Sequence, residues 1–338
     1  MRREHFEKME EQIDILLASY NGKKYIEAQI SSILNQTYKN IKLIISDDCS
    51  TDGTIDILKK YEQKDNRIQL YLQEKNLGVV KNIEFLLKNV TNNLYMLSDQ
   101  DDVWLPEKIE KSVKYLKEND ADLVFGDLRI VDEKLNTIYE SFSKYMLLDR
   151  KINKYIGSKK LNYLYNCVTG CTILSKKKFI KEILPLPAIS KYMIHDHWIG
   201  LIISFNGKLA YMPEQYILYR QHGNNEVGTK KISHEMTDIN EVRQLFINVK
   251  LGVFESYIKY NSKFPEELQK LNIKALEYYK MLNTKKKVNF EGWGTFHKLY
   301  KTEKFMYYIE NFIILNMPCI GKEMFKLRLL ILKVLKKR

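Results

Sequence analysis

Residues 94–104 read Leu-Tyr-Met-Leu-Ser-Asp-Gln-Asp-Asp-Val-Trp. The apolar residues at the start of this stretch are typical of a buried strand. A cluster of acids, Asp99, Asp101 and Asp102, follows the strand almost directly. An isolated Asp-x-Asp pair is usually part of a solvated turn, so the meaning of this one depends on the segments around it.

Strand and helix patterns alternate in the segment that precedes this stretch. Runs of mainly apolar residues predict strands at residues 13–18, 41–45 and 68–72. Apolar residues at helical spacing predict helices at residues 25–34, 55–61 and 79–87, and Thr54 is the expected N-cap of the second. Strands that alternate with helices in this way predict an α/β fold, with an open parallel sheet and helices on both of its faces.

Polar residues close three of the expected strands. Ligands of open parallel sheets bind beyond the carboxyl ends of the strands, so we expect these closing residues to meet at one edge. They are Ser19, Tyr20 and Asn21 after the first strand, Asp47 and Asp48 after the second, and residues 99–102 after the fourth.

The acids after the fourth strand are suited to a hard divalent cation. Carboxylates one residue apart can share Mg²⁺, which takes one or two carboxylates and leaves its other positions to water and phosphates. The chain contains neither G-x-x-x-x-G-K-[ST] nor G-x-G-x-x-G, which argues against a P-loop hydrolase and a dinucleotide oxidoreductase. A site for a nucleoside diphosphate that relies on metal and side chains remains.

The composition is that of a globular protein with a sizeable core. The chain has 338 residues, 45% of them apolar, and a formal charge of +13. Its longest uncharged stretch, residues 161–175, is shorter than the roughly 18–20 apolar residues of a membrane span, and residues 1–11 lack the apolar core of a signal peptide. We therefore expect a cytoplasmic protein without a transmembrane helix, whose cysteines (Cys49, Cys167, Cys171 and Cys319) are reduced.

The positive charge is concentrated in the last third of the chain. Residues 226–338 hold 22 basic and 12 acidic side chains and so carry +10 of the +13. A uniformly basic nucleic-acid-binding protein would not show this asymmetry, and no nucleic-acid partner is expected. The distribution suits a nearly neutral catalytic body with a basic docking region.

The last third also changes its pattern to helices. Apolar faces recur within residues 242–253 and 268–282, and residues 321–338 form a basic amphipathic pattern with Lys322, Lys326, Lys333 and Lys337 on one stripe. Such a helix suits an anionic membrane surface. The alternative is a helix that packs on the protein and keeps a solvated lysine edge.

Taken together, the motifs resemble the family 2 glycosyltransferases of the GT-A fold. The resemblance rests on residues 15–22, 44–54, 76–78 and 98–104, in the order and spacing of the family. The motifs at residues 166–172, 195–198 and 219–225 look like the acceptor-side motifs of bacterial polysaccharide members. The resemblance implies an N-terminal leader at residues 1–10, a Rossmann-like GT-A domain at 11–228 and a basic helical appendage at 229–338.

The resemblance also implies roles on the donor side. Asp48, with Asp47 beside it, matches a carboxylate that accepts a hydrogen bond from a pyrimidine base. Asp99 matches the first acid of the DxD motif, on ribose or metal, and Asp101 the second, on a Mn²⁺ or Mg²⁺ ion. Further expected contacts to the nucleotide and its phosphates are Ser19, Tyr20, Asn21, Lys75 and Arg220.

On the acceptor side, Asp196 matches the general base of the family. His222 lies where some members place a further metal or phosphate contact. Residues expected to line the sugar and the acceptor are Asp102, Trp104, His195, His197 and Trp198.

The residues themselves leave alternatives open. Asp47 and Asp48 are also consistent with a turn that caps the next helix, and Asp196 with a helix N-cap, although nucleotide contact and the role of base are favoured. His195 and His197 flank Asp196 in a zinc-like alternation, but no further ligands follow at zinc-like spacing, so packing or substrate contact is favoured. The remaining candidates, His222, Lys75 and Arg220, are also consistent with ordinary solvated loop residues.

The resulting hypothesis is an inverting, metal-dependent glycosyltransferase. It would move a sugar from a nucleotide donor, dTDP-rhamnose by resemblance or otherwise a UDP-hexose, to a bacterial cell-surface polysaccharide such as a capsule or cell-wall glycan. The acceptor is expected to be lipid-linked, which places the enzyme peripherally on the cytoplasmic face of the plasma membrane. The alternatives are a non-catalytic basic protein that binds membranes or nucleic acid, and a metal-dependent nucleotidyltransferase, which would release pyrophosphate.

Overall fold

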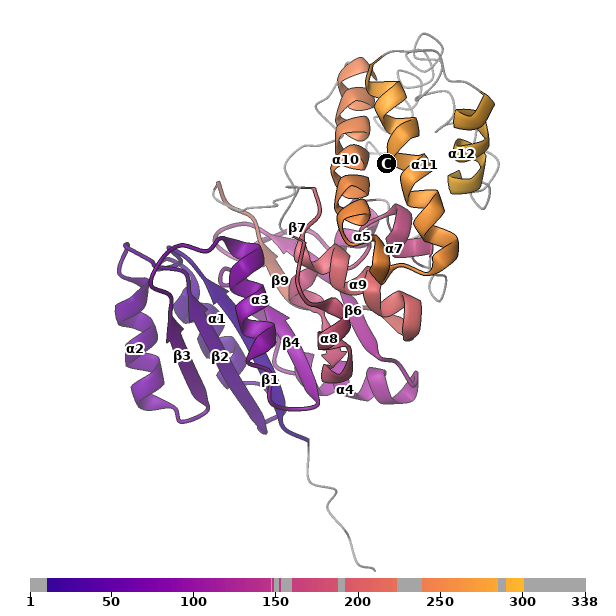
Figure 1. Ribbon diagram of the computed structural model, residues 1–338. Helices are drawn as coiled ribbons and strands as arrows, with labels where there is room; N and C mark the ends of the chain where they lie inside the picture. The colour runs from indigo at the N-terminus through magenta and orange to yellow at the C-terminus, as the bar shows by residue number, and fades with distance from the viewer. Residues whose placement is uncertain are drawn as a thin grey trace, which may run out of the picture. The chain divides into compact units, whose positions relative to one another are not determined.

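The computed structural model describes residues 11–146, 148, 152, 160–187, 192–223, 239–284 and 290–300, and Figure 1 shows it as a ribbon. The chain divides into two compact units, of which the first includes residues 11–187 and 194–223 and the second the helices from residue 239 onward. The expected leader, Cys319 and the expected basic helix at residues 321–338 lie outside the described residues.

The strands and helices expected before residue 98 are present in the first unit. Strand β1 is hydrogen-bonded on one side to β2 and on the other to β4, both parallel to it, and β2 pairs in parallel with β3. Helix α3 contacts β1 and β2, as Figure 1 shows. These elements are β1 (Ile13–Ser19), α1 (Ile26–Leu34), β2 (Ile41–Asp47), α2 (Thr54–Lys64), β3 (Ile68–Leu72), α3 (Val79–Lys88) and β4 (Leu94–Ser98).

The remaining elements of this unit complete a mixed sheet and its surroundings. The strand order is β3-β2-β1-β4-β8-β6-β9-β5, with β7 paired to β6. The added strands are β5 (Val103–Trp104), β6 (Leu123–Val131), β7 (Thr137–Tyr139), β8 (Leu174–Lys176) and β9 (Leu209–Arg220). The added helices are α4 (Lys108–Glu118), α5 (Phe142–Tyr145), α7 (Lys160–Leu164), η1 (Gly170–Thr172), η2 (Lys177–Phe179), α8 (Ile180–Ile183) and α9 (His195–Asn206).

The prediction of an open parallel sheet holds for β1 to β4, whereas the described strands beyond β4 make the sheet mixed, although β6 and β9 are also parallel. Strand β8 is antiparallel to both β4 and β6, and β5 is antiparallel to β9. Parallel neighbours need a crossover of a dozen or more residues. The connection from β6 to β7 is too short for such a crossover and fits their antiparallel pairing. The direction of β8 beside β4 and β6 is instead set by pairing between segments far apart in the sequence.

Apolar side chains of the central strands are buried on both faces of the sheet. Ile13, Ile15 and Leu17 of β1 are completely buried in one core cluster with Ile30 of α1 and Leu58 of α2. Leu16, which points to the other face, is buried as well. Strands that are buried on both faces read as continuous apolar runs, which is why these strands could be recognised in the sequence.

One expected helix cap is wrong. The residue before α2 is Gly53, whose φ of 95° is a left-handed conformation that favours glycine. The side chain that caps the helix belongs to Asp52, whose Oδ1 accepts a hydrogen bond from the Thr54 backbone N–H at 3.0 Å. Thr54 is therefore the first residue of the helix, and its hydroxyl also donates to Asp52.

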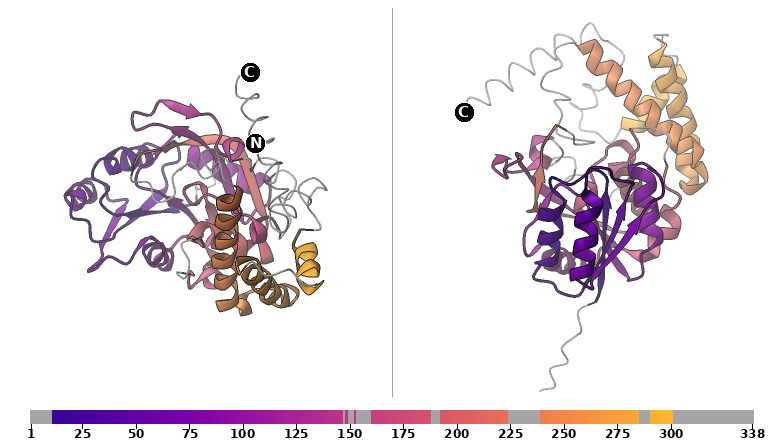
Figure 2. Two further views of the ribbon diagram at one scale, coloured as in Figure 1. Left: turned by 90° about the horizontal axis from the view of Figure 1, so that it is seen from above. Right: turned by 90° about the vertical axis from the view of Figure 1, so that its left-hand side faces the viewer.

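The second unit is helical, as the sequence predicts. Helices α10 (Ile239–Lys259), α11 (Glu266–Asn283) and α12 (Phe290–Tyr300) pack in sequence order, with the short η3 (Asn261–Lys263) between the first two (Figure 2). Phe254 of α10 stacks on Tyr279 of α11 with ring centroids 5.6 Å apart. The most buried side chains of α10 include Ile247 and Tyr257, whereas Leu245 of the predicted face is only partly buried.

Among the described helices, none combines the length and the hydropathy needed to cross a bilayer.

Candidate active site

The topology of the sheet brings distant segments to one edge. Strands β1, β2, β4, β6 and β9 all run in the same direction, so their carboxyl ends lie together. Strand β8 runs the opposite way, so the short helix η1 that precedes it reaches the same edge. The acidic residues 99–102, the helix η1 and the residues after β9 are therefore neighbours, although up to about 120 positions separate them in the sequence.

Arg220, at the end of β9, holds the acidic loop in place. Its backbone N–H donates to Asp102 Oδ1 at 3.1 Å, and its Nε donates to the carbonyl oxygen of Asp101 at 2.8 Å. Its Nη1 donates to the carbonyl oxygen of Glu133 at 2.6 Å. Arg220 is only 5% exposed, and its guanidinium is hydrogen-bonded to backbone carbonyl oxygens of the protein. The structure therefore does not support the phosphate contact expected for it.

His222 lies directly against the second acid of the motif. Its Nε2 is 2.8 Å from Asp101 Oδ2. The imidazole stacks on the ring of Tyr25, with centroids 4.7 Å apart and planes 24° from parallel. The Arg220 guanidinium lies over the same tyrosine ring, 4.8 Å from its centroid. Tyr25, which the sequence analysis did not single out, thus orients the imidazole toward Asp101.

The acids of the loop repel one another. Asp99 is partly exposed, and burial together with the negative charges of Asp101 and Asp196 raises its pKa to about 7. Burial and the charges of Asp101 and Asp99 raise the pKa of Asp102 well above its usual range. The folded site therefore favours the protonated forms of Asp99 and Asp102.

Two overlapping groups of side chains offer ligand atoms at this point. The first is Asp99 with the Asp101–His222 pair, in which the charge of Asp101 is near enough to raise the pKa of Asp99. The second is Asp99, Asp102 and Cys171, whose ligand atoms all lie within 4.8 Å of one another. Burial and the neighbouring carboxylates raise the pKa of the Cys171 thiol well above its usual value, which keeps it protonated. The first group, with oxygen and imidazole donors, therefore suits Mg²⁺ or Mn²⁺ better.

Asp102 and Trp104 lie beneath the acidic loop and not on the acceptor side where they were expected. Asp102 is fully buried and Trp104 is 2% exposed. The Lys108 ammonium lies over the Trp104 ring, 3.4 Å from its centroid, and burial lowers the pKa of Lys108 to about 7. This burial does not favour the acceptor-side role expected for the two residues, because the chain turns inward at Val103 to form β5, which pairs with β9.

On the donor side, the acids after β2 bind the protein's own loops. Asp47 Oδ2 accepts from the Ser19 hydroxyl at 2.9 Å and from the Ser50 hydroxyl at 2.7 Å. Asp48 accepts from the backbone N–H groups of Leu77, at 2.7 Å, and Gly78, at 2.8 Å. Gly78 directly precedes α3. The alternative in which these acids stabilise turns thus describes their contacts in this structure.

The loop after β1 is anchored in the same region. Asn21 accepts from the Thr51 N–H at 2.9 Å, and its own backbone N–H donates to the Ser50 hydroxyl at 2.8 Å. Tyr20 is 48% exposed, and Lys75 is exposed as well. Of the residues predicted to contact the donor, Tyr20 and Lys75 are therefore among those that present a side chain to solvent.

Asp196 lies in the first turn of α9, after the N-cap Ile194, so it is not itself the cap. Its carboxylate accepts from Asn166 Nδ2 and from the Gly170 N–H, both at 3.1 Å. Burial is the main cause that raises the pKa of Asp196. The carboxylate is close enough to Asp99 for its charge to raise the pKa of that acid.

The three residues around Asp196 differ in their surroundings. His197 is 4% exposed, with Nε2 2.6 Å from the carbonyl oxygen of Asn162. Trp198 is fully buried and donates to the carbonyl oxygen of Ile183 at 2.8 Å. Both are core residues and present no surface to an acceptor. His195 remains partly exposed and lies so close to η1 that a Cβ on Gly170 would come within 2.9 Å of its Nε2.

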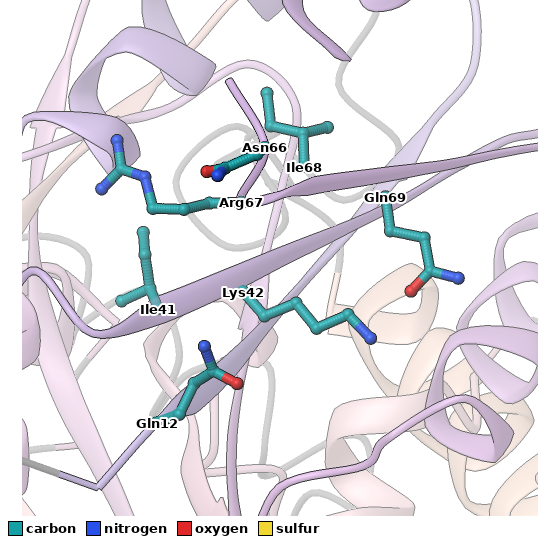
Figure 3. A pocket seen from close by; sticks show the side chains of 7 residues that line it. All are labelled: Gln12, Ile41, Lys42, Asn66, Arg67, Ile68 and Gln69. Atoms are coloured by element: carbon teal, nitrogen blue, oxygen red, sulfur yellow. The ribbon is translucent and has the colours of Figure 1, made fainter. Parts of the chain in front are cut away.

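A hollow elsewhere on the first unit carries no such chemistry (Figure 3). It lies at the amino ends of β1, β2 and β3, opposite the edge described above, and Arg67 within it is paired with Asp65 at 2.7 Å. Its lining consists of Gln12, Ile41, Lys42, Asn66, Arg67, Ile68 and Gln69.

Comparison with known proteins identifies sequence relatives. The model of the family described as Glycosyl transferase family 2 matches residues 14–184. An uncharacterized glycosyltransferase of Haemophilus influenzae is 30% identical over 215 residues, which cover 63% of this chain and 66% of that relative. The dTDP-rhamnosyl transferase RfbG of Shigella flexneri is 29% identical over 63% of this chain and 73% of its own length. The UDP-Glc:alpha-D-GlcNAc-diphosphoundecaprenol beta-1,3-glucosyltransferase WfgD of Escherichia coli is 28% identical over 56% and 69%.

Solved structures of the same architecture extend over most of the chain. S. aureus TarS in complex with UDP-GlcNAc superposes with a TM-score of 0.53 at 14% identity, over 90% of this chain and 81% of that one. The mannosyltransferase PcManGT from Pyrobaculum calidifontis, in complex with GDP-Man and Mn²⁺, superposes with a TM-score of 0.53 at 12% identity, over 96% and 86%. At these identities the likeness concerns the fold alone, and the expected GT-A fold is confirmed.

Proposed function

Since the chain belongs to glycosyltransferase family 2, we propose that it transfers a sugar from a nucleoside-diphosphate donor to a saccharide hydroxyl with inversion at the anomeric carbon. The observation that carries this proposal is the meeting of Asp99, Asp101 and His222 with Asp196 at one edge of the sheet. Asp99, Asp101 and His222 suit the binding of a cation at the departing diphosphate, and Asp196 suits the deprotonation of an incoming hydroxyl.

Asp99, Asp101 and His222 are proposed to stabilise the leaving group. We propose that they hold a divalent cation, Mn²⁺ or Mg²⁺, which neutralises charge on the departing diphosphate. The raised pKa of Asp99, caused by burial and by Asp101 and Asp196, supports this assignment because a cation would relieve the repulsion. Arg220 supports the site indirectly, since it holds the main chain of Asp101 and the carboxylate of Asp102.

Asp196 is proposed to be the general base for the incoming hydroxyl. A carboxylate with a raised pKa is a better proton acceptor than an ordinary aspartate, and burial raises that of Asp196. Its hydrogen bonds to Asn166 and Gly170 fix its orientation. In the proposed step, Asp196 takes the proton of the acceptor hydroxyl while the oxygen forms its bond to the anomeric carbon, and the bond from that carbon to the diphosphate breaks.

The donor is proposed to lie between the acidic loop and the loop after β1. The exposed ring of Tyr20 offers an apolar face to the base, and Lys75 is available to the phosphates. Relatives named for dTDP-rhamnose and for UDP-glucose match at 29% and 28% identity. Both donors are therefore candidates, with dTDP-rhamnose placed first from the Ser98-Asp99-Gln100-Asp101-Asp102-Val103-Trp104 motif.

The acceptor is proposed to be a lipid-linked saccharide of a bacterial surface polysaccharide. WfgD is named for an acceptor on a diphosphoundecaprenol carrier. The basic amphipathic pattern at residues 321–338 would bring the enzyme to an anionic membrane surface. The proposal predicts that the full chain sediments with vesicles that contain phosphatidylglycerol. Replacement of Lys322, Lys326, Lys333 and Lys337 by Gln should release it, and unchanged sedimentation would contradict this part.

Product analysis tests the reaction itself. The enzyme is incubated with dTDP-rhamnose, UDP-glucose or UDP-GlcNAc, Mn²⁺ and a membrane extract, and the released nucleotide is identified by chromatography. Release of a nucleoside diphosphate from one donor supports the proposal. Release of pyrophosphate from a nucleoside triphosphate and a sugar phosphate would instead support the nucleotidyltransferase alternative. Membership of the family argues against a purely non-catalytic basic protein.

A further inference from the structure

Gln100, the residue between the two acids of the motif, makes a contact that the catalytic scheme does not use. Its Nε2 donates to the carbonyl oxygen of Tyr20 at 2.9 Å, and its Oε1 accepts from the Tyr20 backbone N–H at 2.9 Å. The side-chain amide thus satisfies both backbone groups of one residue that lies 80 positions away. A primary amide is suited to this contact because it offers a donor and an acceptor side by side.

A glycine beside this contact leaves room for it. A Cβ built on Gly22 would lie 2.3 Å from Gln100 Oε1 and 2.7 Å from its Cδ, and its three nearest neighbours are all atoms of Gln100. Real Cβ contacts are never this short, so one of the two groups would have to move. No left-handed backbone conformation is involved at Gly22. The absence of a Cβ at residue 22 therefore leaves the space that the Gln100 side chain occupies.

The contact joins the two loops that the proposed donor would bridge. On one side Asp99 and Asp101 are the immediate neighbours of Gln100. On the other side Tyr20 exposes 48% of its surface, and the next residue, Asn21, is tied to the loop after β2 through Ser50 and Thr51. Asn21 thus connects the Tyr20 loop to the loop after β2, whereas the Gln100 amide connects it to the acidic loop.

We propose that Gln100 is a positioning residue for the nucleotide donor. Its amide fixes the separation between the Tyr20 loop, which faces the base, and the carboxylates of Asp99 and Asp101, which face the diphosphate. This inference rests on the proposed function, because it assigns the two ends of the donor to these two loops. A fixed separation favours ligands of one length, since a preorganised site loses less entropy on binding.

The test is a double-mutant cycle of Gly22→Ala, Gln100→Ala and the combined variant. Thermal unfolding measures the contact without any ligand. We expect Gly22→Ala to lower Tm in the wild-type background and to have little effect in the Gln100→Ala background, because the obstacle to the new methyl group is then absent. Equal losses in the two backgrounds would overturn the structural basis of the inference.

Donor binding measures the positioning role. We expect Gln100→Met, which keeps the length of the side chain but not its hydrogen bonds, to raise the KM for the nucleotide sugar by roughly 10-fold or more, with a smaller change in kcat. Gln63→Met, at an exposed position of α2, is the matched control and should leave both constants unchanged. An unchanged KM in Gln100→Met would overturn the inference. A wild-type chain that binds no nucleotide would instead overturn the proposed function, while the Tm cycle would still report on the contact.

Discussion

The imidazole of His222 lies 2.8 Å from the carboxylate of Asp101, although 121 positions separate the two residues in the sequence. Asp101 follows β4 and His222 follows β9, two strands whose carboxyl ends share one edge of the sheet. An imidazole and a carboxylate at this distance can share a proton or turn their lone pairs to the same cation. We therefore propose that the metal binds at this pair.

Replacement of His222 should weaken metal binding more than it weakens the fold. We expect His222→Gln to raise the Mn²⁺ concentration needed for half-maximal activity by roughly 10- to 100-fold, the range typical of lost support at metal sites. The measurement is a titration of activity against Mn²⁺. His297→Gln, at an exposed position of α12, serves as the control. An unchanged metal requirement in His222→Gln would remove this residue from the site.

The pKa of Asp99, raised to about 7 from 3.8, predicts how the metal-free chain responds to pH. Burial and the charges of Asp101 and Asp196 favour the protonated form in the folded state, so between these two values the folded chain binds more protons than the unfolded chain. The contribution of Asp99 to stability therefore decreases as pH rises through this window. We expect Asp99→Asn to flatten the decrease of Tm between roughly pH 5 and pH 7, the upper part of the window. Asp56→Asn, at an exposed position of α2, should not.

The same protonation competes with the metal. Because a carboxylate must lose its proton to bind a cation, the apparent affinity for Mn²⁺ should rise as pH increases toward and past the pKa of Asp99, about 7. Calorimetric titration of Mn²⁺ at several pH values measures this dependence. An affinity that is independent of pH across that range would show that Asp99 does not bind the metal.

Asp196 should affect the chemical step and not donor binding. We expect Asp196→Asn to lower kcat by about 10²- to 10⁴-fold, the usual contribution of a general base. The amide has one acceptor oxygen and can replace only one of the two carboxylate oxygens that accept from Asn166 and Gly170, so a Tm measurement must show that the fold around η1 is retained. Nucleotide affinity and Tm are measured alongside kcat. A variant that loses nucleotide binding together with kcat would identify Asp196 as a donor contact instead.

Lys108 offers a prediction about stability alone. Burial lowers its pKa to about 7 from 10.5, so between these values the unfolded chain binds more protons than the folded one. The contribution of Lys108 to stability therefore increases as pH rises from 7 to 10.5. We expect Lys108→Met to raise Tm near neutral pH by a few degrees and to reduce this increase. A lower Tm in the variant would mean that the contact with the Trp104 ring outweighs the burial of the amine.

The parallel half of the fold could be predicted from sequence because its strands are buried on both faces. Ile13, Ile15 and Leu16 belong to one mainly apolar run, interrupted only by Asp14, and are all fully buried. Strand β9 is different, since it alternates buried residues with exposed ones such as Pro213 and Glu214. Its direction in the sheet depends on pairing with β6, a long-range property that no local pattern contains.

The site was predictable to a similar degree. The acids after β4 could be recognised because they follow a strand directly, and the structure brings Asp101 to His222 as a shared site requires. The roles expected for Trp104 and Trp198 are not favoured, because a motif does not reveal which way a side chain points, and both indoles are buried. The contacts of Gln100 and Arg220 with backbone groups left no trace in residue type or spacing.

The central claim is a metal-dependent nucleotide site built on Asp101. Its most direct test is the thermal stability of the wild-type chain and of Asp101→Ala with UDP, dTDP, GDP and CMP, each with and without Mn²⁺. A ligand at 100 times its Kd stabilises the folded state by about 2.7 kcal/mol, which is readily seen as a rise in Tm. We expect stabilisation by a pyrimidine nucleoside diphosphate that requires Mn²⁺ in the wild type and is absent in the variant. Stabilisation that persists in Asp101→Ala, or that occurs equally without metal, would contradict it.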